Sequence, residues 1–143
     1  MGNICRRPLA EAILRRQAQE ANVNIEVDSA GSGDWHVGQR SDARAIAVGE
    51  GRGYTMTHRA RQVRPQDFQT FDLIIVMDEE NLRTLRRMPA FAPEKVHLAR
   101  SFDPMADSLE VEDPYYGTLA EFETITDQLE VACRGIVGEV SKL

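Results

Sequence analysis

The amino-acid sequence predicts an α/β fold in which a parallel sheet carries helices on both faces. Segments of helical and of strand periodicity alternate along the 143 residues, and this alternation is typical of a parallel sheet covered by helices. The stretch DLIIVM at 72–77 is a continuous apolar run of strand length, as expected for a parallel strand buried on both faces. With 42% apolar and 28% charged residues, the chain has an ordinary globular composition, and we expect residues 1–143 to form one domain.

The first half of the chain predicts a helix, a strand and a second, short helix. Apolar residues recur on one face over 8–21, and the leading proline suits the first turn of that helix. Alternating apolar and polar residues predict a strand at 23–28, followed by a glycine-rich loop at 29–39. Either Ser41 or Asp42 would cap the short helix, which ends in a glycine-rich stretch.

The second half predicts two more strands and two more helices. The strands are expected at 72–77 and 95–99, and Asp78 directly after the first of them is placed to cap a helix. Residues 100–117 form a polar loop, and apolar residues at helical spacing from Thr118 onward predict a final helix. Ligands of such folds bind at the carboxyl ends of the strands. The loops to search are therefore 1–8, 28–41, 78–80 and 113–117.

Charge and cysteine content exclude several classes of protein. A net charge of −6 argues against a general nucleic-acid-binding surface, although it leaves room for a local basic pocket. Cys5 and Cys133 are too far apart in the chain to indicate a disulfide scaffold or a zinc site, which favours a reducing, cytoplasmic setting. No apolar run is long enough for a signal peptide or a membrane span. No spacing of His, Asp or Glu indicates a metal, so we expect neither a metal nor another cofactor.

The segment GNICRRP at 2–8 has the features of a phosphate-binding loop. Gly2 and Asn3 tolerate the positive φ angles that let successive amides point into one concavity. The helix that follows adds its positive N-terminal end, and Arg6 offers a planar fork that matches two phosphate oxygens. The alternative interpretation is a plain N-terminus leading into a helix.

Two further loops carry candidate functional side chains. In EDPYYG at 112–117, Asp113 is placed to act as a general acid, and Tyr115 and Tyr116 could wall an aromatic substrate. The alternative is a simple turn, because Asp-Pro and Gly are turn residues. Trp35 lies in the glycine-rich loop, where it either forms a recognition surface or folds back onto the core.

Two of the three histidines can be interpreted from their positions in the sequence. His97 lies in a predicted strand, which indicates a structural role. His58 either orients a loop through a hydrogen bond or lies on the surface.

Five segments of the chain resemble, in order and spacing, the low-molecular-weight protein tyrosine phosphatases. They are GNICRRP, DSAGSGDWHVG, HRARQV, DLIIVMDEENL and DPYYG. The resemblance covers essentially the whole chain. It implies a four-stranded parallel sheet flanked by helices, and a substrate that is a phosphotyrosine protein or a small aryl phosphate. It also implies that inorganic phosphate or sulfate binds at the same loop.

The resemblance further implies a mechanism. In this family a cysteine thiolate attacks phosphorus and forms a phosphocysteine, and an arginine six residues later binds the equatorial oxygens. An aspartic acid in the DP loop protonates the leaving phenolate and then helps water to hydrolyse the intermediate. By resemblance Arg6 is that arginine and Asp113 is that acid.

The remaining site residues are assigned by the same resemblance. The phosphate-binding loop comprises Gly2, Asn3, Ile4, Cys5 and Arg6. Asn3, Ser29 and His58 match the scaffold that supports this loop, and Trp35, Tyr115 and Tyr116 match the aromatic mouth. Cys5 matches a second loop cysteine, which traps the nucleophile in a reversible disulfide.

The chain departs from the family pattern in two ways. The nucleophile's position lies one residue before Met1, and the family's first, central strand is also missing, so we expect the chain as given to be N-terminally incomplete and inactive. Our hypothesis is that Met1 is a downstream methionine inside the loop, with a strand and a cysteine encoded upstream. The second departure is Arg7, where the family usually has a serine that stabilises the thiolate.

The sequence is also compatible with two other functions, and the missing strand has one structural consequence. A non-catalytic phosphate- or phosphotyrosine-binding module would use the same loop, but it has no need of Asp113. An arsenate reductase shares this fold, but it needs further cysteines near 70–80, where the chain has none.

Without a central strand, the sheet has a gap between 23–28 and 72–77. We expect either an oligomer that covers this gap or a monomer of low stability.

Overall fold

The computed structural model describes residues 6–31, 33, 37–114 and 117–143, and its sheet is parallel, as predicted. Strands β1 (Ile74–Val76) and β2 (Val96–Leu98) pair in parallel, with Ile74 opposite Val96 and Val76 opposite Leu98. Both strands lie within the stretches that the sequence predicts, although each is shorter. Parallel strands need a crossover connection, and helix α4 supplies it here.

Helices make up most of the remaining described structure. The α-helices are α1 (Arg6–Glu20), α2 (Ala43–Gly51), α3 (Asp67–Thr70), α4 (Glu79–Arg86) and α5 (Leu119–Val140), and the 3₁₀ helices are η1 (Pro93–Lys95) and η2 (Ala99–Phe102). The side chains of Asp42, Asp78 and Thr118 cap α2, α4 and α5 by accepting backbone N–H groups of the first turns. Among the described residues, no helix is both long and apolar enough to cross a membrane.

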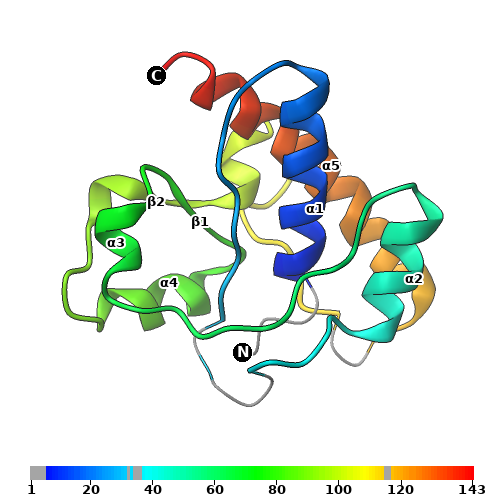
Figure 1. Cartoon of the computed structure of the whole chain (residues 1–143), viewed down its shortest axis with the longest axis horizontal. Coiled ribbons are helices and arrows are strands. Elements are labelled where there is room, and N and C mark those ends of the chain that lie inside the picture. The colour runs from blue at the N-terminus through cyan, green and yellow to red at the C-terminus, as the bar shows by residue number, and fades with distance from the viewer. Residues whose placement is uncertain (1–5, 32, 34–36, 115–116) are drawn as a thin grey trace.

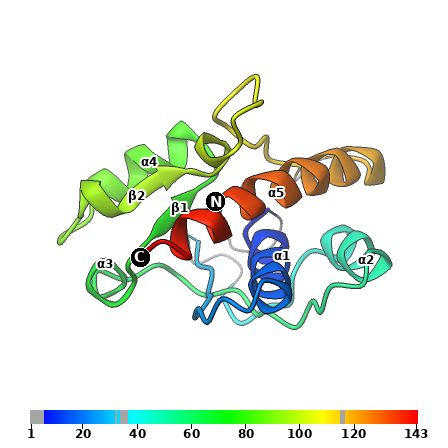
Figure 2. The ribbon, with the colours of Figure 1, turned by 90° about the horizontal axis from the view of Figure 1, so that it is seen from above.

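The helices cover both faces of the sheet and enclose two apolar cores. One core joins α1, α2 and α5 to Met77, which follows β1, and to Ala99, which follows β2. The other core packs Phe68 of α3 and Leu85 of α4 against the side chains of both strands. The two groups of helices lie on opposite sides of the strands when the molecule is seen from above (Figure 2). The predicted fold class is therefore confirmed.

The predicted strand at 23–28 is wrong as a strand. The segment is extended and descends past α1 (Figure 1), but the amides of 24–28 make no hydrogen bond to another backbone group among the described residues. A strand is defined by its neighbour, and the alternating sequence predicts only which side chains face inward. Arg15 supplies one contact, because its Nη2 donates to the Val27 carbonyl at 2.7 Å.

Candidate functional site

The predicted phosphate-binding arginine lies at the start of α1 and is almost fully buried. The Arg6 side chain is 3% exposed. Its Nη1 donates to the Asp78 carboxylate (Oδ2) at 2.8 Å and to the Val111 carbonyl at 2.5 Å. Its Nη2 lies 3.9 Å from the Asp113 carboxylate (Oδ2). The structure thus brings together Arg6 and Asp113, which are far apart in the chain.

These groups meet because the start of α1, the residues after β1 and the polar loop around Val111 lie together at the carboxyl end of β1. Asp78 comes two residues after the last residue of that strand. The Val111 amide donates to the Met77 carbonyl at 2.8 Å, and this bond fastens the polar loop beside the strand. The same loop then places Asp113 next to Arg6. This is the edge of the sheet at which parallel α/β folds bind ligands.

Asp78 holds Arg6 with an ionised carboxylate while it caps α4. Burial by itself would raise the pKa of Asp78. The Asn81 amide, which donates to Oδ1 at 2.8 Å, and the Arg6 guanidinium outweigh burial and hold this pKa below its ordinary value, with a smaller contribution from the charge of Arg7. One carboxylate therefore serves both the helix end and the arginine.

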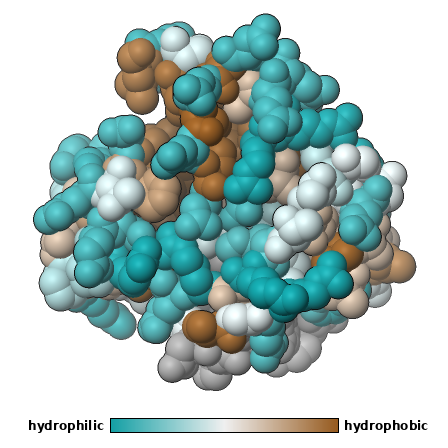
Figure 3. Space-filling view, viewed as in Figure 1, coloured by the Kyte–Doolittle hydropathy of each residue, from teal (hydrophilic) through white to brown (hydrophobic). Residues whose placement is uncertain are grey.

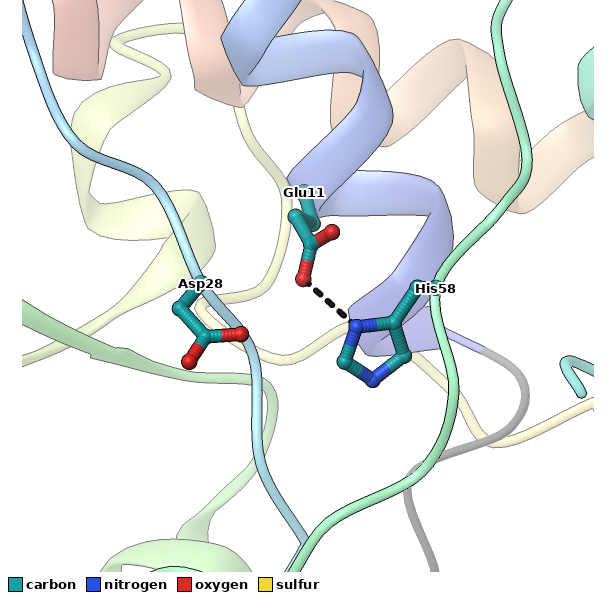
Figure 4. A group of neighbouring side chains, drawn as sticks. All are labelled: Glu11, Asp28 and His58. Carbon is teal, nitrogen blue, oxygen red and sulfur yellow. Dashed lines mark ion pairs between the residues drawn. The ribbon is translucent and has the colours of Figure 1, made fainter. Parts of the chain in front are cut away.

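A second polar group lies one turn further along α1. Glu11 is 6% exposed, and its Oε1 lies 2.9 Å from His58 Nδ1 (Figure 4). The Ser29 hydroxyl donates to the same carboxylate oxygen at 2.8 Å and lies 3.5 Å from His58 Nε2. Burial acts to raise the pKa of Glu11, but the hydrogen bonds from His58 and Ser29 overcome it and lower that pKa. The predicted pair Ser29 and His58 is thus organised around a glutamate.

Asp28 lies beside Glu11 and His58, and the three side chains place ligand-type atoms within 4.8 Å of one another. Figure 4 shows Asp28 on the extended segment, facing the Glu11–His58 pair. Both oxygens of Asp28 already accept hydrogen bonds, one from the Ser29 amide and one from Arg61 Nε, each at 2.8 Å. Protein donors therefore satisfy this carboxylate, and its evident role is to tie the extended segment to the segment around Arg61.

The structure places four of the predicted site residues and shows two partners that sequence reasoning missed. Arg6 lies with Asp113, and Ser29 lies with His58. The other predicted site residues lie outside the described residues: Gly2, Asn3, Ile4, Cys5, Trp35, Tyr115 and Tyr116. The missed partners are Glu11 and Asp78. A signal existed for Glu11, since a charged residue three before Leu14 interrupts the apolar face of its helix; Asp78 is identifiable from sequence only as a helix cap.

The fold and this geometry define a class of protein: an α/β domain with a buried arginine at a helix N-terminus, at the carboxyl end of its parallel sheet, an arrangement suited to an oxyanion. The N-terminal end of α1 carries positive potential, and the buried arginine is fixed beside it at the carboxyl end of the sheet. A family model described as "Low molecular weight phosphotyrosine protein phosphatase" matches residues 1–143. The chain belongs to this family.

Individual relatives agree with the family assignment. The chain is 41% identical to the low molecular weight phosphotyrosine protein phosphatase of Sus scrofa, over 98% of this chain and 91% of that protein. A protein tyrosine phosphatase from Entamoeba histolytica, solved with Hepes in its active site, superposes with a TM-score of 0.94 at 36% identity, over 99% of this chain and 93% of that chain. The tyrosine phosphatase Wzb from Escherichia coli K30, solved with sulphate, gives a TM-score of 0.84 at 30% identity, over 97% and 92%.

Proposed function

We propose that this site hydrolyses phosphotyrosine and other aryl phosphate monoesters, with Arg6 binding the phosphoryl oxygens and Asp113 serving as the general acid. One observation carries the proposal: the buried Arg6 guanidinium lies 3.9 Å from the Asp113 carboxylate at the start of a helix. A phosphoryl group needs a positive fork and an aryl leaving group needs a proton. Arg6 would supply the fork and Asp113 the proton to one ligand bound beside them.

The contacts of Arg6 account for how it would act. Its Nη1 is held by Asp78 and Val111, so the plane of the guanidinium is fixed before any ligand arrives. Preorganised donors of this kind stabilise developing charge without a cost of reorganisation. The Nη2 end lies toward Asp113, and the phosphoryl oxygens would be bound between this end and the amides at the start of α1.

The proposed reaction has two steps. The thiolate of a cysteine six positions before Arg6, outside these 143 residues, attacks phosphorus while the P–O bond to the aryl group breaks, and Asp113 gives its proton to the leaving phenolate. Water then attacks the phosphocysteine, Asp113 takes a proton from that water, and the thiolate and inorganic phosphate are released. Gly2, Asn3, Ile4 and Cys5 would contribute the anion-binding amides.

The other predicted residues take supporting roles in this proposal. Ser29 and His58, joined through Glu11, would hold the base of the phosphate-binding loop in place. Trp35, Tyr115 and Tyr116 would form the aromatic mouth that receives the substrate ring. Because two distant cysteines form no disulfide framework, we also place the protein in the cytoplasm.

We further propose that the 143 residues on their own bind the anion but do not turn it over. The nucleophile's position, six before Arg6, lies outside these residues. Cys5 directly precedes Arg6, whereas the family pattern has the nucleophile six residues before its arginine. Cys133 is 1% exposed, and burial raises the pKa of its thiol to about 12, so it is not a thiolate at neutral pH. For the 143-residue polypeptide alone, the lack of a suitable nucleophile among these residues favours the alternative of a non-catalytic phosphate-binding module.

Titration calorimetry with inorganic phosphate tests the anion site, and p-nitrophenyl phosphate tests turnover. We expect the 143-residue chain to bind phosphate, Arg6→Lys to bind at least tenfold more weakly because lysine lacks the fork, and Arg83→Lys, an exposed control on α4, to bind normally. No hydrolysis above buffer is expected. Equal phosphate binding by Arg6→Lys, or hydrolysis by the 143-residue chain, would refute the proposed roles.

A further inference from the structure

Two exposed arginines, Arg40 and Arg59, lie directly opposite each other in an antiparallel bridge. Backbone hydrogen bonds hold the two segments together: the Gly38 amide donates to the Ala60 carbonyl at 2.7 Å, and the Ala60 amide donates to the Gln39 carbonyl at 2.8 Å. Side chains that are directly opposite in such a pair lie on the same face, with their Cβ atoms about 5 Å apart. The bridge therefore presents two guanidinium groups on one small patch of surface, which we call the arginine pair.

The arginine pair carries positive charge that the described part of the chain does not neutralise. Neighbouring arginines are bound by carboxylates: Arg44 lies 2.9 Å from Asp42, and Arg61 lies 2.8 Å from Asp28. Among the described residues, no ion pair involves either member of the arginine pair. Like charges directly opposite each other are destabilising, and the chain as a whole has a net charge of −6. A concentrated positive patch on an acidic protein is suited to an external anion.

Contacts on both sides fasten the arginine pair beside the candidate site. His58, which directly precedes Arg59, lies 2.9 Å from Glu11 on α1. On the other side, Nη1 of Arg44 donates to the Gly117 carbonyl at 2.7 Å. This bond joins the start of α2 to the end of the loop that carries the proposed general acid. The arginine pair thus lies on a segment held between the loop-supporting group and the acid loop.

The views of the whole molecule agree with this position. Segments 37–41 and 58–62 run side by side and pass the lower end of α1, where Arg6 lies (Figure 1). Hydrophilic side chains predominate over the lower middle of the molecule in the same view (Figure 3). An extended peptide advances about 3.3 Å per residue. A substrate whose phosphotyrosine enters at Arg6 would therefore lay its neighbouring residues over this surface.

We propose that the arginine pair is a specificity element that binds acidic side chains flanking the phosphotyrosine of a protein substrate. The inference rests on the proposed function, because it takes the phosphotyrosine to be bound at Arg6. A guanidinium fork binds a carboxylate through two parallel hydrogen bonds, so two opposed forks can bind two carboxylates or clamp one. Charged groups at the edge of a binding surface act mainly on the choice of partner and on the association rate.

Fluorescence anisotropy of labelled phosphotyrosine peptides tests the arginine pair. The acidic peptide has an aspartate and a glutamate on each side of the phosphotyrosine; the neutral peptide has asparagine and glutamine there, and a third peptide has lysines. The test variant is Arg40→Gln with Arg59→Gln. Its matched control, Arg83→Gln with Arg86→Gln, removes two exposed arginines from α4 and changes the net charge equally. A third variant, Arg40→Glu with Arg59→Glu, reverses the charge. Circular dichroism checks that all variants fold, and competition with inorganic phosphate checks that the peptides occupy the site.

We expect the wild type and the α4 control to bind the acidic peptide about fivefold more tightly than the neutral peptide, as two exposed ion pairs would give. This preference should disappear in Arg40→Gln with Arg59→Gln, and the charge-reversed variant should bind the lysine peptide more tightly than the acidic one. Equal binding of the acidic and neutral peptides to the wild type, or an unchanged preference in the glutamine variant, would overturn the inference while phosphate competition leaves the proposed function standing. Absence of phosphate binding would refute the proposed function and the inference with it.

Discussion

Replacing Asp78 by asparagine tests whether one carboxylate orients the site arginine. Asp78→Asn keeps the shape of the side chain and an oxygen that accepts the Asn81 amide, so the cap on α4 survives. The negative charge opposite Arg6 is lost, at a contact of 2.8 Å between groups that are 3% and 19% exposed. The experiment therefore isolates the ion pair from the helix cap.

The expected loss of stability is about 2 kcal/mol. A hydrogen bond to a charged group contributes about 1.5–3 kcal/mol, and stranding a fully buried charge costs about 3–5 kcal/mol. The lower range applies because Arg6 keeps the Val111 carbonyl and lies near Asp113. At a typical urea dependence this corresponds to a midpoint shift of about 1 M.

The pH dependence of the same variant has a definite sign. The pKa of Asp78 is lower in the folded protein than its ordinary 3.8, so its contribution is fully present above that ordinary value. It is lost as the pH falls through the folded pKa. The difference in unfolding free energy between wild type and Asp78→Asn should therefore be constant near neutral pH and shrink below 3.8.

Urea denaturation followed by circular dichroism, from pH 7 down to pH 3, measures both effects. Asp107→Asn is the matched control, since Asp107 pairs with Arg100 at 2.9 Å but is 91% exposed, and exposed pairs contribute about 0–1 kcal/mol. A loss for Asp78→Asn no larger than that for Asp107→Asn would refute the reasoning. So would a loss that stays the same at acid pH.

Two further substitutions follow from the structure. Glu11→Gln removes the charged partner of His58 and should lower the unfolding free energy by about 1–3 kcal/mol at neutral pH. Because the pKa of Glu11 is lowered in the folded state, this loss should fade in acid. A urea titration that shows no loss at pH 7 would contradict the assigned contact. Gly135→Ala would place its Cβ 2.1 Å from the Phe102 carbonyl and should cost about 1–3 kcal/mol or more. Gly138→Ala meets nothing within 4 Å and should raise stability by up to about 1 kcal/mol. Equal melting temperatures for the two alanine variants would show that α5 does not pack on η2 as described.

Local sequence signals predict the longer helices and the positions of β1 and β2, but not which extended segments pair in the sheet. A cap at Ser41 or Asp42, the cap at Asp78 and the apolar spacing from Thr118 onward predict α2, α4 and α5 closely, because caps and amphipathic faces act within a few residues. The segment 23–28 has the alternation of a strand, but pairing depends on a neighbour that its own residues do not encode. The helix α3 was not predicted, since its 4 residues are too few for a periodic pattern.

In the candidate site too, the motif residues can be predicted from the sequence, but their long-range contacts cannot. Arg6 and Asp113 are identifiable from their motifs, whereas the Arg6–Asp78 contact joins residues 72 positions apart and depends on how α1 packs against the end of β1. Glu11 was missed for a related reason: its partners, Ser29 and His58, come from two loops that meet only in the folded chain.

The most direct test of the account is turnover of p-nitrophenyl phosphate by the chain extended at its N-terminus. The extension adds a strand of apolar residues ending in a cysteine immediately before Met1, with serine in place of that cysteine as the control. We predict no turnover by the 143-residue chain or by the serine form, clear turnover by the cysteine form, and a loss of about 10²-fold or more when Asp113→Asn is added. A folded, phosphate-binding cysteine form without turnover, or equal turnover by the unextended chain, would contradict the account.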